Sequence, residues 1–195
     1  LPWELGIAET HQTLILNGLR TRVRIESDSK LLSGRDVAIS CMLGAEEFGF
    51  GTTLLMCEGC VMMRVCNLDT CPMGICTQNP ELRKHFRGKP EYIIHYLTFV
   101  AQELREYMAK LGVRTIDELV GRTDLLHVKP SAPGSRTAKM NLDCILHNPA
   151  IANSNVHFVP ADTYDFHLEN TLDMKVLMKK FKLSSKTPQS VTLDV

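Results

Sequence analysis

A short cysteine-rich segment contains the residues whose types and spacing could carry chemistry. Five of the seven cysteines lie within residues 57–76. Three of them, Cys60, Cys66 and Cys71, are separated by five and then four residues, and Pro72 follows the last. Thiolates grouped in this way can bind the iron atoms of a sulfide-bridged core, and a proline directly after a ligand recurs in ferredoxin-type sites. The spacing therefore predicts an iron–sulfur cluster held by these three cysteines.

Zinc is the main alternative for the same thiols. A structural zinc ion takes four nitrogen or sulfur ligands, usually from two paired Cys-x-x-Cys turns. The segment holds one such pair, Cys57 and Cys60, so a zinc site of Cys57, Cys60, Cys66 and Cys71 stays open. Cys76 is a reserve fourth ligand that could equally fill a small apolar space. A group of buried thiols without any metal is the third interpretation.

Composition narrows the classes of partner. Lysine plus arginine equals aspartate plus glutamate at 22 each, so no large field attracts nucleic acid or anionic lipid. No apolar run approaches the roughly 20 residues that cross a bilayer. Crowded thiols without a secretory leader indicate a reducing compartment, and we expect a cytoplasmic protein. Residues 1–6 lack an initiator methionine, and we expect them to continue from a longer chain.

Local patterns predict the elements that must position the cysteines. Ser33 can cap a helix, Thr115 and Glu118 form a capping box, and Gly112 ends a strongly amphipathic helix. In chain order we expect a helix within 8–19, a strand at 23–25, a loop at 27–30, a helix at 35–43, a strand at 48–56, a helix at 90–111 and a short helix from 116. Helices alternating with strands and no hairpin signal indicate parallel βα units, an α/β fold.

The remainder of the chain carries weaker patterns. Residues 129–135 are rich in proline, serine and glycine, which is typical of a linker. We therefore expect one unit at 1–128 and an irregular C-terminal extension at 129–195. Within the extension, 171–181 is a possible helix and 191–195 alternates like a strand. The isolated Cys41 and Cys144 are expected to pack without a chemical role.

Several stretches together resemble one enzyme family. They are residues 1–6, 8–12, 34–36, 44–49, 59–72, 77–79 and 121–126, and with them the whole span 1–126 is similar to the large subunit of glutamate synthase. The resemblance implies that residues 1–128 are the C-terminal portion of a (β/α)₈ TIM barrel that binds FMN, with an iron–sulfur loop at 60–76. It also implies that 129–195 leads toward a β-helix domain that is not present in this sequence.

The resemblance also implies cofactors and a reaction. In that family a [3Fe-4S] cluster is bound by cysteines that match Cys60, Cys66 and Cys71. Electrons from a reduced pyridine nucleotide or ferredoxin, brought by an electron-donor subunit or by ferredoxin itself, pass through the cluster to FMN. The flavin then reduces 2-iminoglutarate, so that 2-oxoglutarate and glutamine-derived ammonia become two glutamates.

The expected FMN contacts lie in two loops. Barrel enzymes commonly hold a ligand phosphate with the loops after strands seven and eight. Under the resemblance those loops correspond to Ser29 and Lys30 and to Gly49, Gly51 and Thr52. The family typically has two glycines at 29 and 30, so this sequence departs from its pattern there. Lys30 would then act on the phosphate as a point charge.

The expected role is therefore that of one part of an oxidoreductase. The partners would be the remaining glutamate synthase segments or subunits and the electron donor, and the substrates would be 2-oxoglutarate and glutamine. We expect no catalysis by this chain alone, because the other barrel strands, the glutamine-hydrolysing nucleophile and most 2-oxoglutarate contacts lie elsewhere in the family. Two alternatives remain, a non-enzymatic iron–sulfur or zinc module for electron transfer or redox sensing, and an inactive truncated product.

Overall fold

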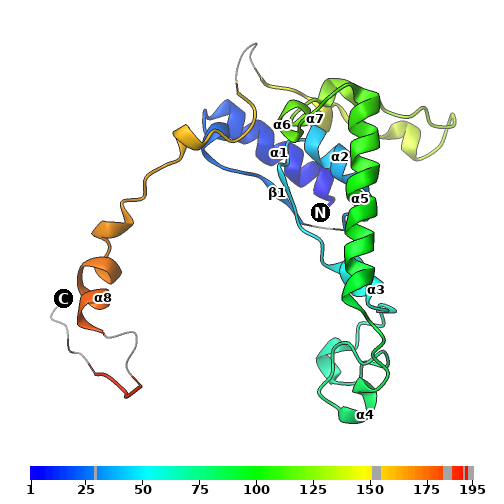
Figure 1. Ribbon diagram of the computed structural model, residues 1–195. Coiled ribbons are helices and arrows are strands. Elements are labelled where there is room, and N and C mark those ends of the chain that lie inside the picture. Colours follow the sequence, from blue (N-terminus) through cyan, green and yellow to red (C-terminus); the bar gives the residue numbers. More distant parts are fainter. Residues whose placement is uncertain (29, 151–154, 182–185, 191, 193–195) are drawn as a thin grey trace.

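The chain is mostly helical with one small parallel sheet (Figure 1). The computed structural model describes residues 1–28, 30–150, 155–181, 186–190 and 192. The elements are α1 (Trp3–Leu16), β1 (Glu26–Ser27), α2 (Gly34–Met42), β2 (Glu47–Phe48), α3 (Thr52–Cys57), α4 (Pro80–Arg83), α5 (Pro90–Leu111), α6 (Ile116–Leu119), α7 (Asp143–Leu146) and α8 (Met178–Lys180). No helix among them is long and apolar enough to cross a membrane.

A single β1–α2–β2 unit confirms the parallel pairing that the alternation predicts. Glu26 pairs with Glu47 and Ser27 with Phe48, while α2 makes the crossover. Ser33 caps α2 as expected, because its Oγ accepts a hydrogen bond from the Asp36 backbone N–H at 3.2 Å. Within the described residues no third strand joins the pair, so both outer edges are free for strands of another segment.

The crossover helix α2 packs closely against the long helix α5. The Gly34 backbone lies so near α5 that an added Cβ would stand 2.5 Å from the Leu104 backbone nitrogen. The Gly34 N–H also donates to Glu103 Oε2 at 2.8 Å. A core forms between these helices and α6, and its buried residues are Ala38, Cys41, Met42, Met108, Val113 and Leu119. This contact anchors one half of α5.

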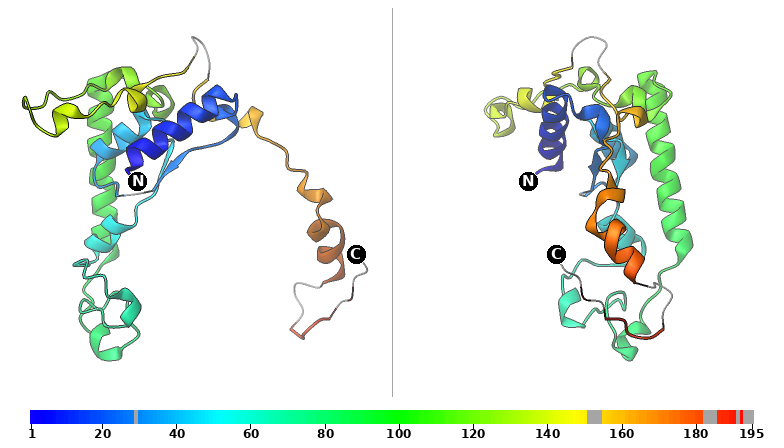
Figure 2. Two further views of the ribbon diagram at one scale, coloured as in Figure 1. Left: turned by 180° about the vertical axis from the view of Figure 1, so that it is seen from behind. Right: turned by 90° about the vertical axis from the view of Figure 1, so that its left-hand side faces the viewer.

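A second core lies on the other side of the βαβ unit, where α1 packs. It contains Ile7 and Ala8 of α1, together with Ile25, Leu43 and Ala45 around the strands. The right view of Figure 2 shows α2 between α1 and α5. The two strands thus lie inside a helical framework, as in one sector of a layered α/β fold.

The N-terminal half of α5 projects beyond these cores toward the cysteine-rich loop (Figure 1). The expected helix bounds are confirmed, with Pro90 in the first turn and Gly112 at φ +75° after the last. The expected apolar stripe is buried only in part. Of the expected stripe residues Ile93, Leu97, Val100, Leu104, Met108 and Leu111, Val100 and Met108 are buried and Leu97 is 36% exposed. Off the stripe, Phe99 is 69% exposed and Ile94 59% exposed. Apolar residues all around this half of the helix are typical of a segment enclosed on several sides.

Three expected boundaries were wrong. The strand predicted at 48–56 ends at Phe48, and Thr52–Cys57 forms helix α3, because a short apolar run fits either structure. The first strand is β1 at Glu26–Ser27 rather than 23–25, since pairing with β2 sets its position. The first helix spans Trp3–Leu16 rather than lying within 8–19, and it ends two residues before Gly18, which has φ +64°.

The C-terminal extension is irregular, as expected. It returns to the N-terminal unit where the Val159 N–H donates to the Thr21 carbonyl oxygen at 2.9 Å, and then leads away from it (Figure 1). The possible helix at 171–181 is present as a π-helical turn, Asp173–Leu177, followed by α8. The strand expected at 191–195 lies outside the described residues, except for Thr192.

Candidate metal centre

The three predicted ligands surround one pocket. A cavity of about 120 Å³ is lined by Cys60, Cys66 and Cys71 together with Thr52 and Leu55 of α3. The other lining residues are Val61, Met62, Met63, Arg64, Val65, Pro72 and Met73. Most of this lining is apolar, although Cys66, Val61 and Met63 are exposed. The tertiary structure therefore brings together three cysteines that the sequence places up to eleven residues apart.

The separation of the sulfurs bears on which metal centre the site could hold. The Sγ atoms of Cys60, Cys66 and Cys71 do not all lie within 4.8 Å of one another. One zinc ion with Zn–S bonds of about 2.3 Å would draw its ligands to about 4 Å from each other. A sulfide-bridged iron core has its irons at separate corners and takes thiolates that are farther apart. The donor set fits the cluster better than zinc.

The backbone of the loop turns repeatedly around the pocket. Met62, Arg64 and Asp69 are non-glycine residues in the left-handed region, with φ of +58°, +61° and +57°. Such conformations are uncommon and concentrate at binding sites. The Cys60 N–H donates to the Leu55 carbonyl oxygen at 2.9 Å, which joins the first ligand to the end of α3. The loop is therefore shaped by local turns rather than by a helix or strand.

Cys71 has the environment of a thiolate. Its side chain is buried, and hydrogen bonds from the backbone N–H groups, that of Cys76 first, hold its pKa below the ordinary value despite some desolvation. The N–H groups of Ile75, Met73 and Gly74 act in the same direction. Because metals bind the deprotonated sulfur, this turn favours the form that a metal needs.

The two reserve ligands lie outside the pocket lining. Cys57 is half-buried at the end of α3 and Cys76 is exposed. The Cys76 thiol donates to the Cys66 carbonyl oxygen at 3.9 Å. Partial desolvation of the thiol, and then the neighbouring Cys66, raise the pKa of Cys76. Cys41, by contrast, packs in the α2–α5 core as expected, whereas the expectation that Cys144 packs was wrong, because its side chain is exposed.

The residues expected near FMN divide into three groups. Ser29 lies outside the described residues, and Lys30 is exposed at φ +54°. The Gly49 N–H already donates to the Ser27 carbonyl oxygen at 2.9 Å, and a Cβ on Gly49 would stand 2.7 Å from the Asp28 side chain. Gly51 and Thr52 form the start of α3, and Thr52 also lines the cysteine pocket. The two candidate sites therefore adjoin at Thr52.

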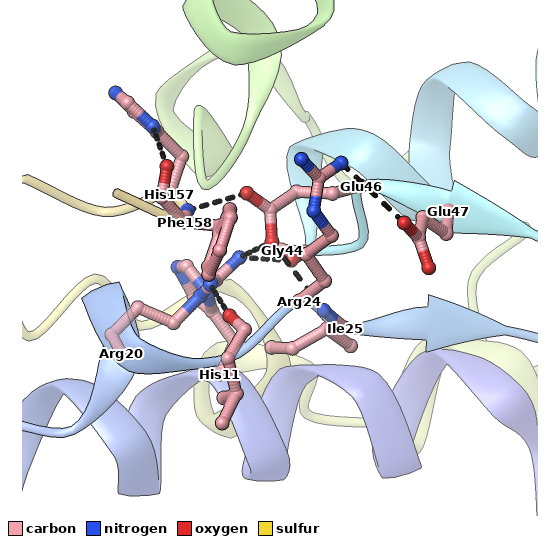
Figure 3. Close-up of polar contacts among 10 residues, drawn as sticks. His11, Arg20, Arg24, Ile25, Gly44, Glu46, Glu47, His157 and Phe158 are labelled. Atoms are coloured by element: carbon pink, nitrogen blue, oxygen red, sulfur yellow. Dashed lines mark hydrogen bonds and ion pairs between the residues drawn. The ribbon is translucent and has the colours of Figure 1, made fainter. Parts of the chain in front are cut away.

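A buried polar network was missed by the sequence analysis. Figure 3 shows Arg20 between His11 and Glu46. Its Nη2 lies 2.7 Å from Glu46 Oε2, and its Nε donates to His11 Nδ1 at 3.0 Å. Desolvation first, and then the Arg20 charge, lower the pKa of His11 to about 4. Single charged residues in unrelated segments carry no motif, so no pattern could have indicated this network.

The same network reaches the C-terminal extension. The Phe158 N–H donates to Glu46 Oε1 at 2.5 Å, and the Arg24 guanidinium lies 4.6 Å from the centre of the Phe158 ring (Figure 3). Glu46 therefore joins the start of β2 to a segment more than a hundred residues later. The network supports the fold around the strands and lies apart from the cysteine pocket.

Comparison with known proteins bears on the pocket's function. Residues 1–114 match a family model described as a conserved region in glutamate synthase. The chain belongs to the glutamate synthase family. The NADPH-dependent glutamate synthase large chain of Bacillus subtilis is 57% identical over 150 residues, 76% of this chain and 10% of that protein. The NADH-dependent glutamate synthase of Schizosaccharomyces pombe is 63% identical over 128 residues, 66% of this chain and 6% of that protein.

The relatives also include a ferredoxin-dependent glutamate synthase from Synechocystis, 44% identical over 148 residues, 76% of this chain and 10% of that protein. The chain thus spans about a tenth or less of the glutamate synthases that it matches. Its resemblance to the glutamate synthase large subunit is confirmed. The matched region 1–114 contains all three cysteines of the pocket.

Proposed function

We propose that this chain supplies the [3Fe-4S] cluster ligands of a glutamate synthase and one wall of its FMN site. The observation that carries the proposal is the shared pocket of Cys60, Cys66 and Cys71 in a chain of this family. Three sulfurs that do not all lie within 4.8 Å of one another, an apolar lining and a backbone turn that favours the Cys71 thiolate all support it. When bound, the cluster would pass electrons one at a time to the flavin.

The chain's own residues prepare the site in separate ways. Leu55 fixes Cys60 through its carbonyl oxygen, and the amides after Cys71 stabilise a sulfur anion. The apolar residues around the thiols would lower the polarity of the site, which influences the potential of any cluster it holds. Arg64 lines the same pocket, and its guanidinium would be available to a negatively charged cluster there.

The proposed flavin wall comprises Ser29, Lys30, Gly49, Gly51 and Thr52. Its support is the position of Gly51 and Thr52 at the start of α3, with Thr52 also facing the cysteine pocket. This adjacency would place FMN next to the cluster, as electron transfer requires. Lys30 would supply the positive charge that meets the phosphate. The other walls would come from barrel strands that pair with the free edges of β1 and β2.

The complete reaction belongs to a larger assembly. We propose that, with the remaining glutamate synthase segments or subunits, the chain takes part in making glutamate from 2-oxoglutarate and glutamine-derived ammonia. The electron donor would be a reduced pyridine nucleotide, through a donor subunit, or ferredoxin, since relatives of both kinds are similar to this chain. A barrel portion that lacks its neighbouring strands would have no complete substrate site, so we propose no activity for the chain by itself.

An anaerobic preparation tests the proposal. Iron, acid-labile sulfide, zinc and flavin would be quantified on the chain after reconstitution with iron and sulfide, and again with the missing barrel segment co-expressed. We expect iron and sulfide on the chain alone, and flavin only in the complex. Cys60→Ser, Cys66→Ser and Cys71→Ser should each abolish the cluster, whereas Cys144→Ser, at an exposed thiol, should retain it.

Other results would favour the alternatives. Zinc bound without sulfide would reject the cluster and favour a zinc module. A cluster with no flavin, even beside the missing barrel segment, would favour a non-enzymatic electron-transfer module or redox sensor. A chain that binds neither metal nor partner would be an inactive product.

A further inference from the structure

The second half of the cysteine loop is closed by a ring of polar contacts. Asp69 Oδ1 lies 2.8 Å from Thr77 Oγ1 and accepts the Gln78 N–H at 2.6 Å. The Thr77 hydroxyl is also 3.0 Å from the Asp69 carbonyl oxygen, and it accepts the Asn79 N–H at 3.1 Å. The two side chains are eight residues apart in sequence, so their contact closes a loop.

Two of the proposed ligands depend on the ends of this closed loop. Cys71 lies inside it, between Asp69 and Thr77. Cys66 begins the 3₁₀ turn Cys66–Leu68, and Asp69 ends that turn in the left-handed conformation. The hydrogen bonds that hold Asp69 therefore determine the direction in which the backbone leaves Cys66 and enters Cys71.

Apolar packing does little to hold this part of the chain. Residues 66–70 are all exposed, and Leu68 is 61% exposed. On the opposite side the turn after Cys71 rests on α4, where an added Cβ on Gly74 would stand 2.5 Å from the Leu82 carbonyl oxygen. His85 Nδ1 also contacts the Pro72 carbonyl oxygen at 3.1 Å. Hydrogen bonds at one end and α4 at the other thus hold the loop.

We propose that Asp69 and Thr77 form a clasp that positions Cys66 and Cys71 for cluster binding. The inference rests on the proposed function, since it assigns a role toward the same cluster. Both are positioning residues, because they act through the ligands and line no part of the pocket. Groups that orient metal ligands through hydrogen bonds commonly alter metal affinity by about 10- to 100-fold when they are removed. A surface turn that did not influence the positions of Cys66 and Cys71 would have no such effect on the metal.

The test uses the 195-residue chain, reconstituted anaerobically with iron and sulfide. Thr77→Val removes the hydroxyl at nearly constant volume, and Thr77→Ser keeps it. Thr98→Val is the matched control, because the Thr98 hydroxyl is exposed and donates within α5, to the Ile94 carbonyl oxygen at 2.7 Å. The readouts are iron and sulfide per chain, the rate of iron loss to a chelator, and the electron paramagnetic resonance spectrum of the oxidised cluster.

We expect Thr77→Val to lose iron about tenfold faster than the parent chain, consistent with a charge-assisted hydrogen bond, and to broaden the spectrum. Thr77→Ser should restore the parent rate and spectrum, and Thr98→Val should leave both unchanged. At the other side of the clasp, Asp69→Asn keeps an acceptor and tolerates the left-handed backbone, so it should retain the cluster better than Asp69→Ala.

The outcomes separate the two proposals. A parent chain that takes up no iron and sulfide overturns the proposed function, and the clasp with it. A parent chain with a cluster that Thr77→Val leaves equally stable overturns the clasp alone. Equal loss in Thr77→Val and Thr77→Ser would also overturn it, because the hydroxyl would then not be the cause. Circular dichroism of each variant separates cluster loss from unfolding.

Discussion

The guanidinium of Arg20 and the carboxylate of Glu46 form an ion pair of 2.7 Å whose side chains are only 2% and 5% exposed. Arg20 also donates to the carbonyl oxygens of Val23 and Gly44, and Glu46 accepts the Phe158 N–H. This buried pair therefore connects the segment after α1, the residues that precede β1 and β2, and the C-terminal extension. Because neither charge is solvated by water, each is stabilised by the opposite charge of its partner.

Removing one partner of this pair should destabilise the chain strongly. In Arg20→Met the Glu46 carboxylate stays buried without its cation, and we expect the free energy of unfolding to fall by about 3–5 kcal/mol. Urea denaturation followed by circular dichroism measures the change. Lys84→Met is the control, since the Lys84–Glu81 pair is as short but 67% and 76% exposed, and its loss should cost less than about 1 kcal/mol. Equal effects of the two substitutions would contradict the buried role.

Stability should depend on pH through His11. Its folded pKa is about 4 against 6.5 for the free side chain, because it is buried and accepts a hydrogen bond from Arg20. Between pH 6.5 and 4 the His11 side chain binds a proton in the unfolded chain but stays neutral in the folded chain. The stabilising contribution is therefore complete above 6.5 and is lost as the pH falls toward 4, by an amount on the order of 3 kcal/mol.

His11→Gln should remove this part of the pH dependence. Unfolding free energies measured at intervals between pH 4 and 7 would show a smaller slope in the variant than in the parent chain. His95→Gln, at an exposed position on α5, is the matched control and should keep the parent slope. Parallel curves for the parent chain and His11→Gln would mean that another group is responsible.

A side chain at Gly34 should not fit between α2 and α5, because the two helices are in close contact there. A methyl group there would overlap the backbone of α5, with the Leu104 nitrogen at 2.5 Å and the Val100 oxygen at 2.6 Å. We expect Gly34→Ala to lower the free energy of unfolding by about 1–3 kcal/mol, the usual cost of overpacking. Thermal unfolding followed by circular dichroism is the measurement.

Gly6→Ala is the matched control for that substitution. Gly6 lies inside α1, and its added Cβ would meet only the Leu1 side chain, at 3.7 Å. Because alanine favours helix more than glycine does, we expect a gain of up to about 1 kcal/mol. Equal changes in stability for Gly34→Ala and Gly6→Ala would contradict the close contact between α2 and α5.

The thiols should differ sharply in reactivity. Burial first, and then Glu46 and Asp117, raise the pKa of Cys41 to about 12, so its thiolate fraction falls about a thousandfold below that of a free thiol. Native alkylation with iodoacetamide, mapped by mass spectrometry, should leave Cys41 unmodified and modify the exposed Cys144. If the proposed cluster is bound, Cys66 should gain reactivity when a chelator removes it. Protection of Cys144 or rapid labelling of Cys41 would contradict the assigned burial.

Much of the local structure could be predicted from the sequence. The Ser33 cap, the helix from Pro90 to Gly112 and the Thr115 cap were all found where expected. Each depends on residues within three or four positions of one another, so its signal is local. The short run after Phe48 had no such signal. There the prediction of a strand was wrong, and helix α3 formed.

The sequence by itself determined which residues could bind a metal and which family they belong to, because ligand spacing and motif are properties of the linear chain. Only the tertiary structure decided that three cysteines line one pocket with Thr52, and that Arg20 is buried against Glu46. The pair joins residues 26 positions apart, and Glu46 reaches Phe158 another 112 positions along. Burial of a charge depends on what the folded chain places around it, and no periodicity of the sequence records that.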